Sequence, residues 1–399
     1  MNLKKYQERY YKELFENLVP FWIEKGWDKK NGGFYTCLDK TGEIYSTDKS
    51  VWMQGRAGYM FSFLSNAYGK NEQYLTIAKN CIDFLNEHCF DKDGRMYFTM
   101  TADGKPLRKR RYYFSETFYI MANAEYSIAT GDKACLENAK KVYDFVYGIY
   151  VGEVDDPYKI TPKCCEETRK TKALSLPMIL LNITHVMLNA DKSNEEKYLY
   201  IMNKLIKDIK LFNKKGTSLM LESITANNEY LKDIASMRII NPGHTIELSW
   251  FLMQAAQDLN KPELYDFAEK IFNGAFEIGW DKKYGGLLSF VDAEGLPVET
   301  YEHNMKFWWP HTETLIAALM LYKKTRKIEY LNIFGKVSKY VFKYFSDSKN
   351  GEWYGYLNRR GEPNFPESKG TTYKGPFHTL RGASMVDLLL KDIIKEDEK

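Results

Sequence analysis

The chain has 399 residues, of which 44% are hydrophobic and 28% are charged, and its 57 Lys and Arg against 53 Asp and Glu leave a formal net charge of +4. This hydrophobic content is enough for a sizeable buried core. The balanced charge, without a basic run interleaved with aromatic rings, excludes a strong electrostatic attraction to nucleic acid or to a membrane surface.

Targeting signals and membrane segments are not found in the sequence. Residues 1–18 are charged throughout and lack the apolar stretch of a signal peptide, and no stretch of 18 apolar residues occurs. The six cysteines show no metal-ligand spacing. We therefore expect reduced thiols in a cytoplasmic protein without a membrane partner.

Nearly the same octapeptide occurs twice in the chain, as GWDKKNGG in residues 26–33 and as GWDKKYGG in residues 279–286. Each is the start of a longer pattern, in which a Gly follows an Asp by four residues and a second Gly follows it by fourteen. The pattern begins at Asp28, Asp281 and Asp347, and a shorter copy begins at Asp91. A short run rich in aromatic residues between two Gly turns predicts a β-hairpin in each copy.

Paired helical patterns lie between these turns. The first member of each pair is apolar around most of its circumference, as in a buried helix, and the second has an apolar stripe, as in a surface helix. The pairs are 50–69 with 71–90, 114–131 with 132–150, 173–190 with 194–212, 244–260 with 262–279, and 311–326 with 328–345. The segments 377–394 and 6–26 have no sequential partner, so we pair the two ends of the chain with each other.

Six helical hairpins that close into a ring predict an all-α fold, an (α/α)6 barrel with short β-hairpin loops at one end. The alternative is an open solenoid of helix pairs. Pairing of the two chain ends favours the closed barrel. No linker-like tract of Pro, Ser and Gly interrupts the chain, so we expect residues 1–399 to form one domain.

Three of the six histidines begin inner helices at equal spacing. His244, His311 and His378 are 67 residues apart, and each follows a Pro or a Gly-Pro turn. The spacing predicts that all three lie at the same height around the mouth of one cavity. We interpret His88 and His185, which are out of this register, as structural, and we leave the role of His303 open.

Other polar and aromatic residues are predicted at the same mouth. Glu247 is three residues after His244 and shares its helix face, and Glu313 follows His311 by two. Arg56 and Glu116 occupy comparable positions on the first two inner helices, and Lys172 begins the third. The aromatic residues around them are Trp52, Trp250, Trp308, Trp309 and Phe377. Stacking rings and charged groups together suit a polyol ligand such as a sugar.

Cofactor signatures are not found in the sequence. No HExxH, G-x-G-x-x-G or G-x-x-x-x-G-K-[ST] occurs. A metal triad assembled across helices is the competing interpretation of the His and Glu residues, and no spacing supports it. We expect no metal and no nicotinamide in the chemistry, which would then have to proceed by proton transfer.

Four segments resemble the motifs of N-acylglucosamine 2-epimerases: WMQGR, NPGHTIELSWFLM, KFWWPHTE and YKGPFHTLR. The similarity follows the whole chain in order. The wider superfamily shares the (α/α)6 barrel and includes cellobiose 2-epimerases and aldose–ketose isomerases, and these motifs are more similar to the N-acetylglucosamine branch. One departure is Leu380, where relatives often have Pro.

The resemblance implies interconversion of N-acetyl-D-glucosamine and N-acetyl-D-mannosamine at C2 of the open-chain sugar. Two imidazoles, each with a pKa near 6.5, suit removal and return of the C2 proton on opposite faces. By resemblance, His244 and His378 are that pair, and Arg56 stabilises the negative charge that develops on O1. Glu247 and Glu313 would orient hydroxyls or the histidines, and His311 would assist ring opening. Sugar contacts are expected from Trp52, Glu116, Lys172, Trp250, Trp308, Trp309, Phe377 and Arg381.

Several alternatives stay open at this point. A C1–C2 aldose–ketose isomerase and a cellobiose 2-epimerase would use the same barrel. A glycoside hydrolase would need two carboxylates and no histidines, and a non-catalytic sugar-binding barrel would need no histidines either. A homodimer and an effector role for ATP, which would not be a reactant, are further expectations from the resemblance.

Overall fold

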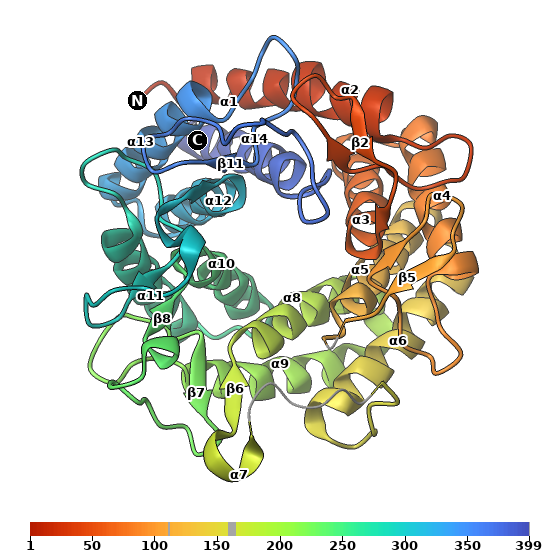
Figure 1. Ribbon diagram of the computed structural model, residues 1–399. Coiled ribbons are helices and arrows are strands. Elements are labelled where there is room, and N and C mark those ends of the chain that lie inside the picture. Colours follow the sequence, from red (N-terminus) through yellow and green to blue (C-terminus); the bar gives the residue numbers. More distant parts are fainter. Residues whose placement is uncertain (111, 159–164, 399) are drawn as a thin grey trace.

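A computed structural model describes residues 1–110, 112–158 and 165–398. The helices form two concentric rings, and the N- and C-terminal helices lie side by side (Figure 1). The inner ring consists of α3 (Val51–Tyr68), α5 (Phe114–Thr130), α8 (Ser175–Ala190), α10 (Pro242–Asp258), α12 (Trp308–Thr325) and α14 (His378–Asp397). The outer ring contains α4 (Glu72–His88), α6 (Lys133–Val151), α9 (Glu195–Lys210), α11 (Glu263–Gly279) and α13 (Ile328–Tyr344), completed by the N-terminal helical run. The predicted (α/α)6 barrel is confirmed.

The N-terminal helical run closes the ring. It consists of α1 (Leu3–Lys12), η1 (Glu13–Leu18), α2 (Val19–Phe21) and η2 (Trp22–Gly26), and it packs against α14. The side chain of Gln7 donates to Asp387 Oδ1 at 2.6 Å, and the hydroxyl of Tyr68 in α3 donates to Asp387 Oδ2 at 2.7 Å. A buried carboxylate near the end of the chain therefore joins the first and last elements, as the pairing of the unpartnered segments predicted.

Close packing between α3 and α5 depends on Gly55 in the segment WMQGR. A Cβ atom at this position would lie 2.6 Å from backbone atoms of Phe118, closer than van der Waals contact permits. Only glycine lets the two inner helices approach to this distance. The next residue, Arg56, is thereby held against α5 at the inner surface of the barrel.

The repeated octapeptide is a turn fixed by a buried ion pair. In the first copy, Asp28 Oδ1 accepts from the backbone N–H groups of Lys30 and Asn31, and Oδ2 accepts from Lys49 Nζ at 2.8 Å. The lysine is fully buried and also donates to the carbonyl of Gly32. The same arrangement recurs in the pairs Asp281–Lys306 and Asp347–Lys369, each at 2.9 Å. The octapeptide therefore repeats because each copy makes the same turn between an outer helix and the next inner one.

The short strands only partly follow the predicted hairpins. Hairpins form where β1 (Cys37–Leu38) pairs with β2 (Ile44–Ser46), and where β4 (Thr99–Met100) pairs with β5 (Pro106–Arg108). In the copy that begins at Asp281, the hairpin forms only around the first Gly turn, where Trp280 pairs with Leu287. Later in the same copy, β9 (Val291–Asp292) pairs with β8 (Ile239–Ile240) of the preceding repeat, because neighbouring loops lie side by side around the ring.

The remaining strands also make pairs that join separate loops. They are β3 (Lys49–Ser50) with β4, β6 (Thr171–Ala173) with β7 (Ser223–Thr225), and β10 (Lys306–Phe307) with β11 (Tyr356–Leu357). Each pair precedes an inner helix and ties its first turn to a neighbouring loop. These ladders fix the end of the barrel at which the inner helices begin.

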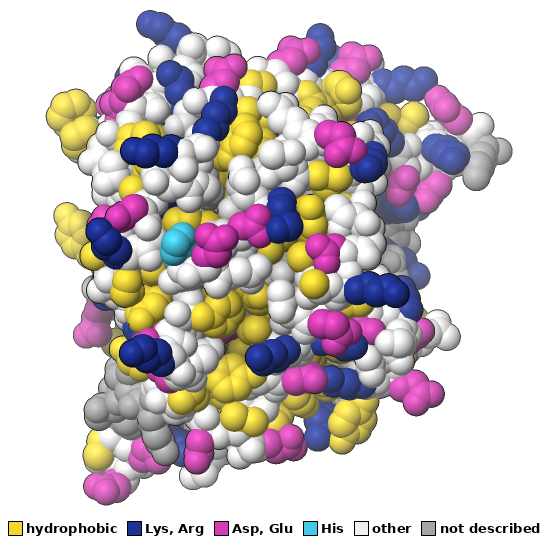
Figure 2. Space-filling view, turned by 90° about the vertical axis from the view of Figure 1, so that its right-hand side faces the viewer, with side chains coloured by type: hydrophobic (Ala, Val, Ile, Leu, Met, Phe, Trp, Pro, Cys, Tyr) yellow, Lys and Arg dark blue, Asp and Glu magenta, His cyan; other side chains and the backbone are white. Residues whose placement is uncertain are grey.

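The outer surface carries both signs of charge. Figure 2 shows the side of the ring where α4 lies, with acidic and basic side chains interspersed among smaller apolar areas. Within the described residues, no helix is both long and apolar enough to cross a membrane. Cys37, Cys81, Cys89, Cys135 and Cys165 are free thiols, and Cys164 lies outside the described residues.

Candidate active site

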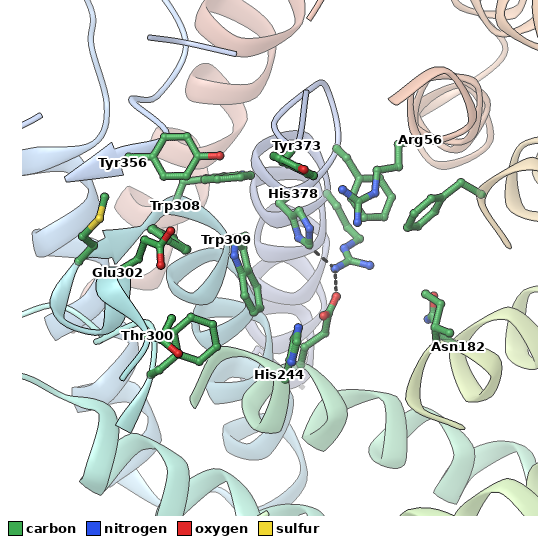
Figure 3. Close-up of a pocket in the computed structure, with 18 of the residues that line it drawn as sticks. Arg56, Asn182, His244, Thr300, Glu302, Trp308, Trp309, Tyr356, Tyr373 and His378 are labelled. Atoms are coloured by element: carbon green, nitrogen blue, oxygen red, sulfur yellow. Dashed lines mark hydrogen bonds and ion pairs between the residues drawn. The ribbon is translucent and has the colours of Figure 1, made fainter. Parts of the chain in front are cut away.

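A cavity of about 790 Å³ opens at the end of the barrel where the inner helices begin (Figure 3). Its volume is typical of a site for a small molecule. The charged, imidazole and amide groups that line it are Arg56, Asn182, His244, Glu247, Glu302, Asn364, His378 and Arg381. Aromatic walls come from Phe118, Phe251, Phe290, Phe307, Trp308, Trp309, Tyr356, Tyr373 and Phe377, among others. The site thus combines a few polar groups with stacking surfaces.

His244 is the third residue of α10 and is fixed by its own helix start. Its backbone N–H donates to the side chain of Asn241, which caps the helix, and its ring lies 5.3 Å from that of Trp309. Its Nδ1 is 3.0 Å from Glu222 Oε2. Burial by itself lowers the pKa of His244, but the charge of Glu222 and the hydrogen bond to it raise the pKa above the usual 6.5.

His378 begins α14 and has a different electrostatic environment. Its Nδ1 is 2.8 Å from Glu313 Oε1 and 3.4 Å from a guanidinium nitrogen of Arg381. Because the carboxylate is closer, we assign the Nδ1 proton to this hydrogen bond, which leaves Nε2 as the free acceptor of the neutral ring. Burial lowers the pKa of His378 well below 6.5, and the positive charges of Arg381 and Arg56 lower it further.

Arg381 holds two carboxylates together behind the histidines. Its guanidinium contacts Glu247 Oε1 at 2.5 Å and Glu313 Oε2 at 3.0 Å, and Trp250 Nε1 also donates to Glu313 at 2.9 Å. Glu247, Glu313 and His378 each offer a ligand atom within 4.8 Å of the others, the spacing of a metal site. Arg381 already supplies a positive charge between the two carboxylates, so this donor set suits a guanidinium better than a second cation.

Arg56 presents free hydrogen-bond donors to the cavity. Its guanidinium carbon lies 4.2 Å from the ring centroid of Phe118 and 4.8 Å from that of Phe377. Within the part of the chain that the structure describes, Arg56 has no hydrogen-bond or ion-pair partner, and its Nε is buried. Burial lowers its pKa to about 9. A buried donor without a protein partner is costly, so an oxygen of a bound ligand is the natural partner.

The predicted residues that reach the cavity are brought together from four inner helices. Arg56 comes from α3, His244 and Glu247 from α10, Trp308 and Trp309 from α12, and Phe377, His378 and Arg381 from α14 or the residue before it. Figure 3 shows His244 and His378 facing the same space, with Trp309 on one side and Arg56 and Asn182 on the other. Two further aromatic residues, Trp52 and Trp250, lie behind this lining and pack against it.

His311 is not brought to the cavity, although its spacing predicted that it would be. Its Nε2 accepts from the backbone N–H of Leu287 at 2.9 Å, and its Nδ1 donates to the carbonyl of Phe307 at 2.7 Å. The ring is fully buried and stacks parallel to Tyr340 of outer helix α13, with centroids 5.2 Å apart. Burial lowers the pKa of His311 to about 3, so the ring is neutral.

Two further predicted contacts lie elsewhere. Glu116 is fully buried, where it pairs with Arg95 at 2.7 Å and accepts from the backbone N–H of Met96. Lys172 lies in strand β6, is exposed, and donates to the side chain of Asn228. Neither is part of the cavity lining, and Glu313 also lies behind it, fully buried.

The remaining histidines lie outside the cavity lining. His185 pairs through Nδ1 with Asp258 at 2.5 Å, and His88 packs on the ring of Phe84. His303, whose role the sequence left open, donates from Nδ1 to the carbonyl of Thr300 at 2.9 Å. That bond lies within the loop that supplies Glu302 to the cavity wall.

Several lining residues were missed by the sequence analysis. Asn182 is a polar residue in the otherwise apolar segment PMILLNI, and that contrast was a usable signal. Thr300, Glu302, Asn364 and Tyr373 come from the segments between helices, and Tyr356 from the short strand β11, and helical periodicity does not predict the course of these segments. Glu222, the partner of His244, immediately precedes strand β7, and no motif marks it.

The sequence model of the N-acylglucosamine 2-epimerase family matches residues 33–379. The N-acylglucosamine 2-epimerase of Rattus norvegicus is 33% identical over 398 residues, which is 98% of this chain and 94% of that protein. The cellobiose 2-epimerase of Bacteroides fragilis is 24% identical, over 95% of this chain and 97% of that protein. A solved cellobiose 2-epimerase from Bacillus thermoamylovorans has the same fold, with a TM-score of 0.83 at 20% identity over 97% of this chain and 100% of that chain.

These similarities extend over nearly the full length of each relative, so the match is not confined to the four motifs. The chain belongs to the N-acylglucosamine 2-epimerase family and is a sugar epimerase, and hence an isomerase.

Proposed function

We propose that the protein interconverts N-acetyl-D-glucosamine and N-acetyl-D-mannosamine, with His244 and His378 as the two acid–base groups. The observation that carries this proposal is a pair of imidazoles that face one cavity from α10 and α14, each bonded at Nδ1 to a carboxylate. The choice of sugar is supported by the 33% identity to an N-acylglucosamine 2-epimerase, against 24% to a cellobiose 2-epimerase.

The reaction starts from the open-chain sugar, because only there does a neighbouring carbonyl acidify the C2 proton. Neutral His378, with Nε2 free, removes that proton when C2–H faces it. Protonated His244 then returns a proton to the opposite face of C2. The reverse reaction uses the same two groups with their protonation states exchanged, so neither direction needs an additional residue.

Arg56 stabilises the enolate between the two proton transfers. As C2 loses its proton, negative charge develops on O1, and a preorganised donor at that position lowers the barrier. Among the described residues the guanidinium of Arg56 has no carboxylate partner, whereas Arg381 is bound to two carboxylates. Trp309, which lies between the two imidazoles, supplies a stacking face for the sugar chain.

The carboxylates have different supporting roles. Glu313 fixes the tautomer of His378, because it accepts from Nδ1 and leaves Nε2 toward the cavity. Glu247 lines the cavity and is available to sugar hydroxyls while its other contact holds Arg381. His311 has no ring nitrogen free, so we leave it out of the chemistry and assign ring opening to no residue.

The substrate is tested by incubating the enzyme separately with N-acetyl-D-glucosamine, D-mannose and cellobiose, with products identified by proton NMR. We expect N-acetyl-D-mannosamine from the first and little or no product from the others. Fructose from mannose, with N-acetyl-D-glucosamine unchanged, would identify an aldose–ketose isomerase. A 2-epimer of cellobiose under the same conditions would identify a cellobiose 2-epimerase.

The expected cytoplasmic location, homodimer and effect of ATP remain predictions. Light scattering of the purified protein measures the oligomeric state, and cell fractionation measures the location. Initial rates with and without ATP, at a fixed concentration of free Mg²⁺, test for an effector. An increase in rate without ATP consumption would support a role outside the chemistry.

A further inference from the structure

The two histidines of the proposed pair have carboxylate partners in unlike surroundings. Glu313, the partner of His378, is fully buried but also accepts from Arg381 and from Trp250. Its negative charge is therefore balanced whether or not His378 carries a second proton. Protonation of His378 would place an extra positive charge beside Arg381 and Arg56.

Glu222, the partner of His244, has no such balance. Its Oε2 is 3.0 Å from His244 Nδ1, and its Oε1 is buried without a hydrogen-bond partner. Over the described ranges of the chain, no Lys or Arg forms an ion pair with it, and its side chain is only 18% exposed. A shielded carboxylate of this kind is costly unless a positive charge lies next to it.

The other charged groups that face His244 do not change this balance. Glu247 lies one turn along α10 and is negative, although Arg381 is bound to it. His378 faces His244 from α14 as the neutral member of the pair. The group beside the His244 ring on α12 is Trp309, which is uncharged. The imidazole itself is therefore the one group in this cluster placed to compensate Glu222.

We propose that Glu222 is a positioning residue that keeps His244 protonated and holds its Nε2–H toward the cavity, so that the resting enzyme has its acid on α10 and its base on α14. This inference rests on the proposed histidine pair and adds to it the residue that decides which member carries the proton. Glu222 does not line the cavity, so it acts through His244 and not on the sugar. The raised pKa of His244 and the lowered pKa of His378 agree with this assignment.

The proposal predicts a pH profile with a definite sign. The active free enzyme needs His378 neutral and His244 protonated, so kcat/KM falls at acid pH when His378 gains a proton and at alkaline pH when His244 loses one. Removing the charge of Glu222 lowers the pKa of His244, and the alkaline limb moves toward acid. The variant must lower kcat/KM by the same factor in the forward and reverse directions. The ratio of the two values equals the equilibrium constant between the sugars, which no change in the enzyme can alter.

The test is the variant Glu222→Gln, whose amide oxygen can still accept from Nδ1 while the charge is lost. We expect the alkaline limb to move about 1 to 3 pH units toward acid, the range for loss of an adjacent opposite charge, with the acid limb unchanged. At a pH above the new limb, kcat/KM falls roughly tenfold or more. Glu229→Gln removes an exposed carboxylate from the same loop and should leave the profile unchanged.

Two further measurements keep the test decisive. Glu222→Asp retains the charge, so its alkaline limb should stay closer to that of the wild type than does the limb of Glu222→Gln. Titration of the His244 imidazole by ¹⁵N NMR, with the signal assigned by its loss in His244→Asn, reports the pKa without any activity. Limbs that superimpose for wild type and Glu222→Gln, or an unchanged His244 titration in a folded variant, would overturn the inference.

Failure of this inference can be distinguished from failure of the proposed function. If His244→Asn epimerises at the wild-type rate, the histidine pair is wrong, whereas the NMR titration still shows whether Glu222 controls the proton on His244. If His244→Asn is inactive and Glu222→Gln has an unshifted titration, the pair stands and only the role of Glu222 is wrong.

Discussion

His378 and His311 begin neighbouring inner helices at the same repeat spacing, yet they have opposite surroundings. His378 lines the cavity and leaves Nε2 free, whereas His311 has both ring nitrogens bonded to backbone groups and stacks on an outer helix. The difference lies in the groups that each ring meets, because the backbone N–H of Leu287 and the carbonyl of Phe307 hold His311 away from the cavity. Equal spacing in the sequence therefore does not give equal surroundings.

The comparison shows that a residue repeated at the same spacing can have a structural role in one copy and a proposed chemical role in another. His311 donates to the end of strand β10 and accepts from the turn after the second octapeptide, so it holds the loop that precedes α12. His378 relies on Glu313 and Arg381 for its orientation and its protonation state. One histidine therefore supports the local fold, and the other is set for proton transfer.

The largest effect is expected from His378→Asn. Epimerisation should fall by roughly 10² to 10⁴, the scale of general acid–base catalysis, with little change in stability. In D₂O, His244 should still exchange the C2 proton of the one epimer that faces it, and His244→Asn should exchange the other. Proton NMR of both sugars measures rate and label together.

The control for this pair is His185→Asn, which removes a histidine bonded to Asp258 outside the active-site cavity and should keep near wild-type activity. Near wild-type epimerisation by either variant of the pair, or a product without deuterium at C2, would contradict the two-histidine assignment.

Arg56→Gln should lower kcat by roughly 10² to 10³, the usual loss when one donor to a developing oxyanion is removed. KM should change less, because the charge on O1 exists only during the reaction. Steady-state kinetics with N-acetyl-D-glucosamine separate the two parameters. If KM rises and kcat is unchanged, Arg56 binds the ground-state sugar instead and its proposed role is wrong.

On the structural side of the comparison, Lys306→Met should destabilise the fold by roughly 3 kcal/mol. The change leaves Asp281 buried with part of its charge unpaired, although Arg359 still contacts it at 2.9 Å. Urea unfolding followed by circular dichroism measures the loss. Lys282→Met, at the exposed neighbour in the same turn, is the matched control and should shift the midpoint little.

The smallest effect, and the sharpest test of the comparison, is expected from His311→Gln. The glutamine amide cannot replace both ring nitrogens, so either the N–H of Leu287 or the carbonyl of Phe307 loses its partner, which should cost about 1 to 3 kcal/mol of stability. The activity of the folded variant should stay within about threefold of wild type. If a stable His311→Gln protein instead loses as much activity as His378→Asn, the two histidines do not differ as described here.

Much of the fold was predictable because its signals are local in the chain. The alternation of apolar and striped helices, the unpartnered ends at residues 6–26 and 377–394, and the octapeptide turns indicated a closed ring of hairpins. In the copy that begins at Asp281, the pairing of the later strand, β9, was mispredicted because its backbone bonds are made with the preceding repeat. Such pairing depends on which loops lie side by side in the folded ring, so the sequence of one repeat does not predict it.

The candidate site divides in the same way. Sequence by itself determined that His244, His378, Arg56 and the two tryptophans Trp308 and Trp309 lie near the starts of inner helices, since motif and helix start are local in the chain. Only the tertiary structure decided that His311 faces outward and that Glu222 is bonded to His244. The physical reason is that a helix fixes its own residues through bonds four positions apart, whereas its rotation and its side-chain partners are fixed by contacts between helices and loops distant in the chain.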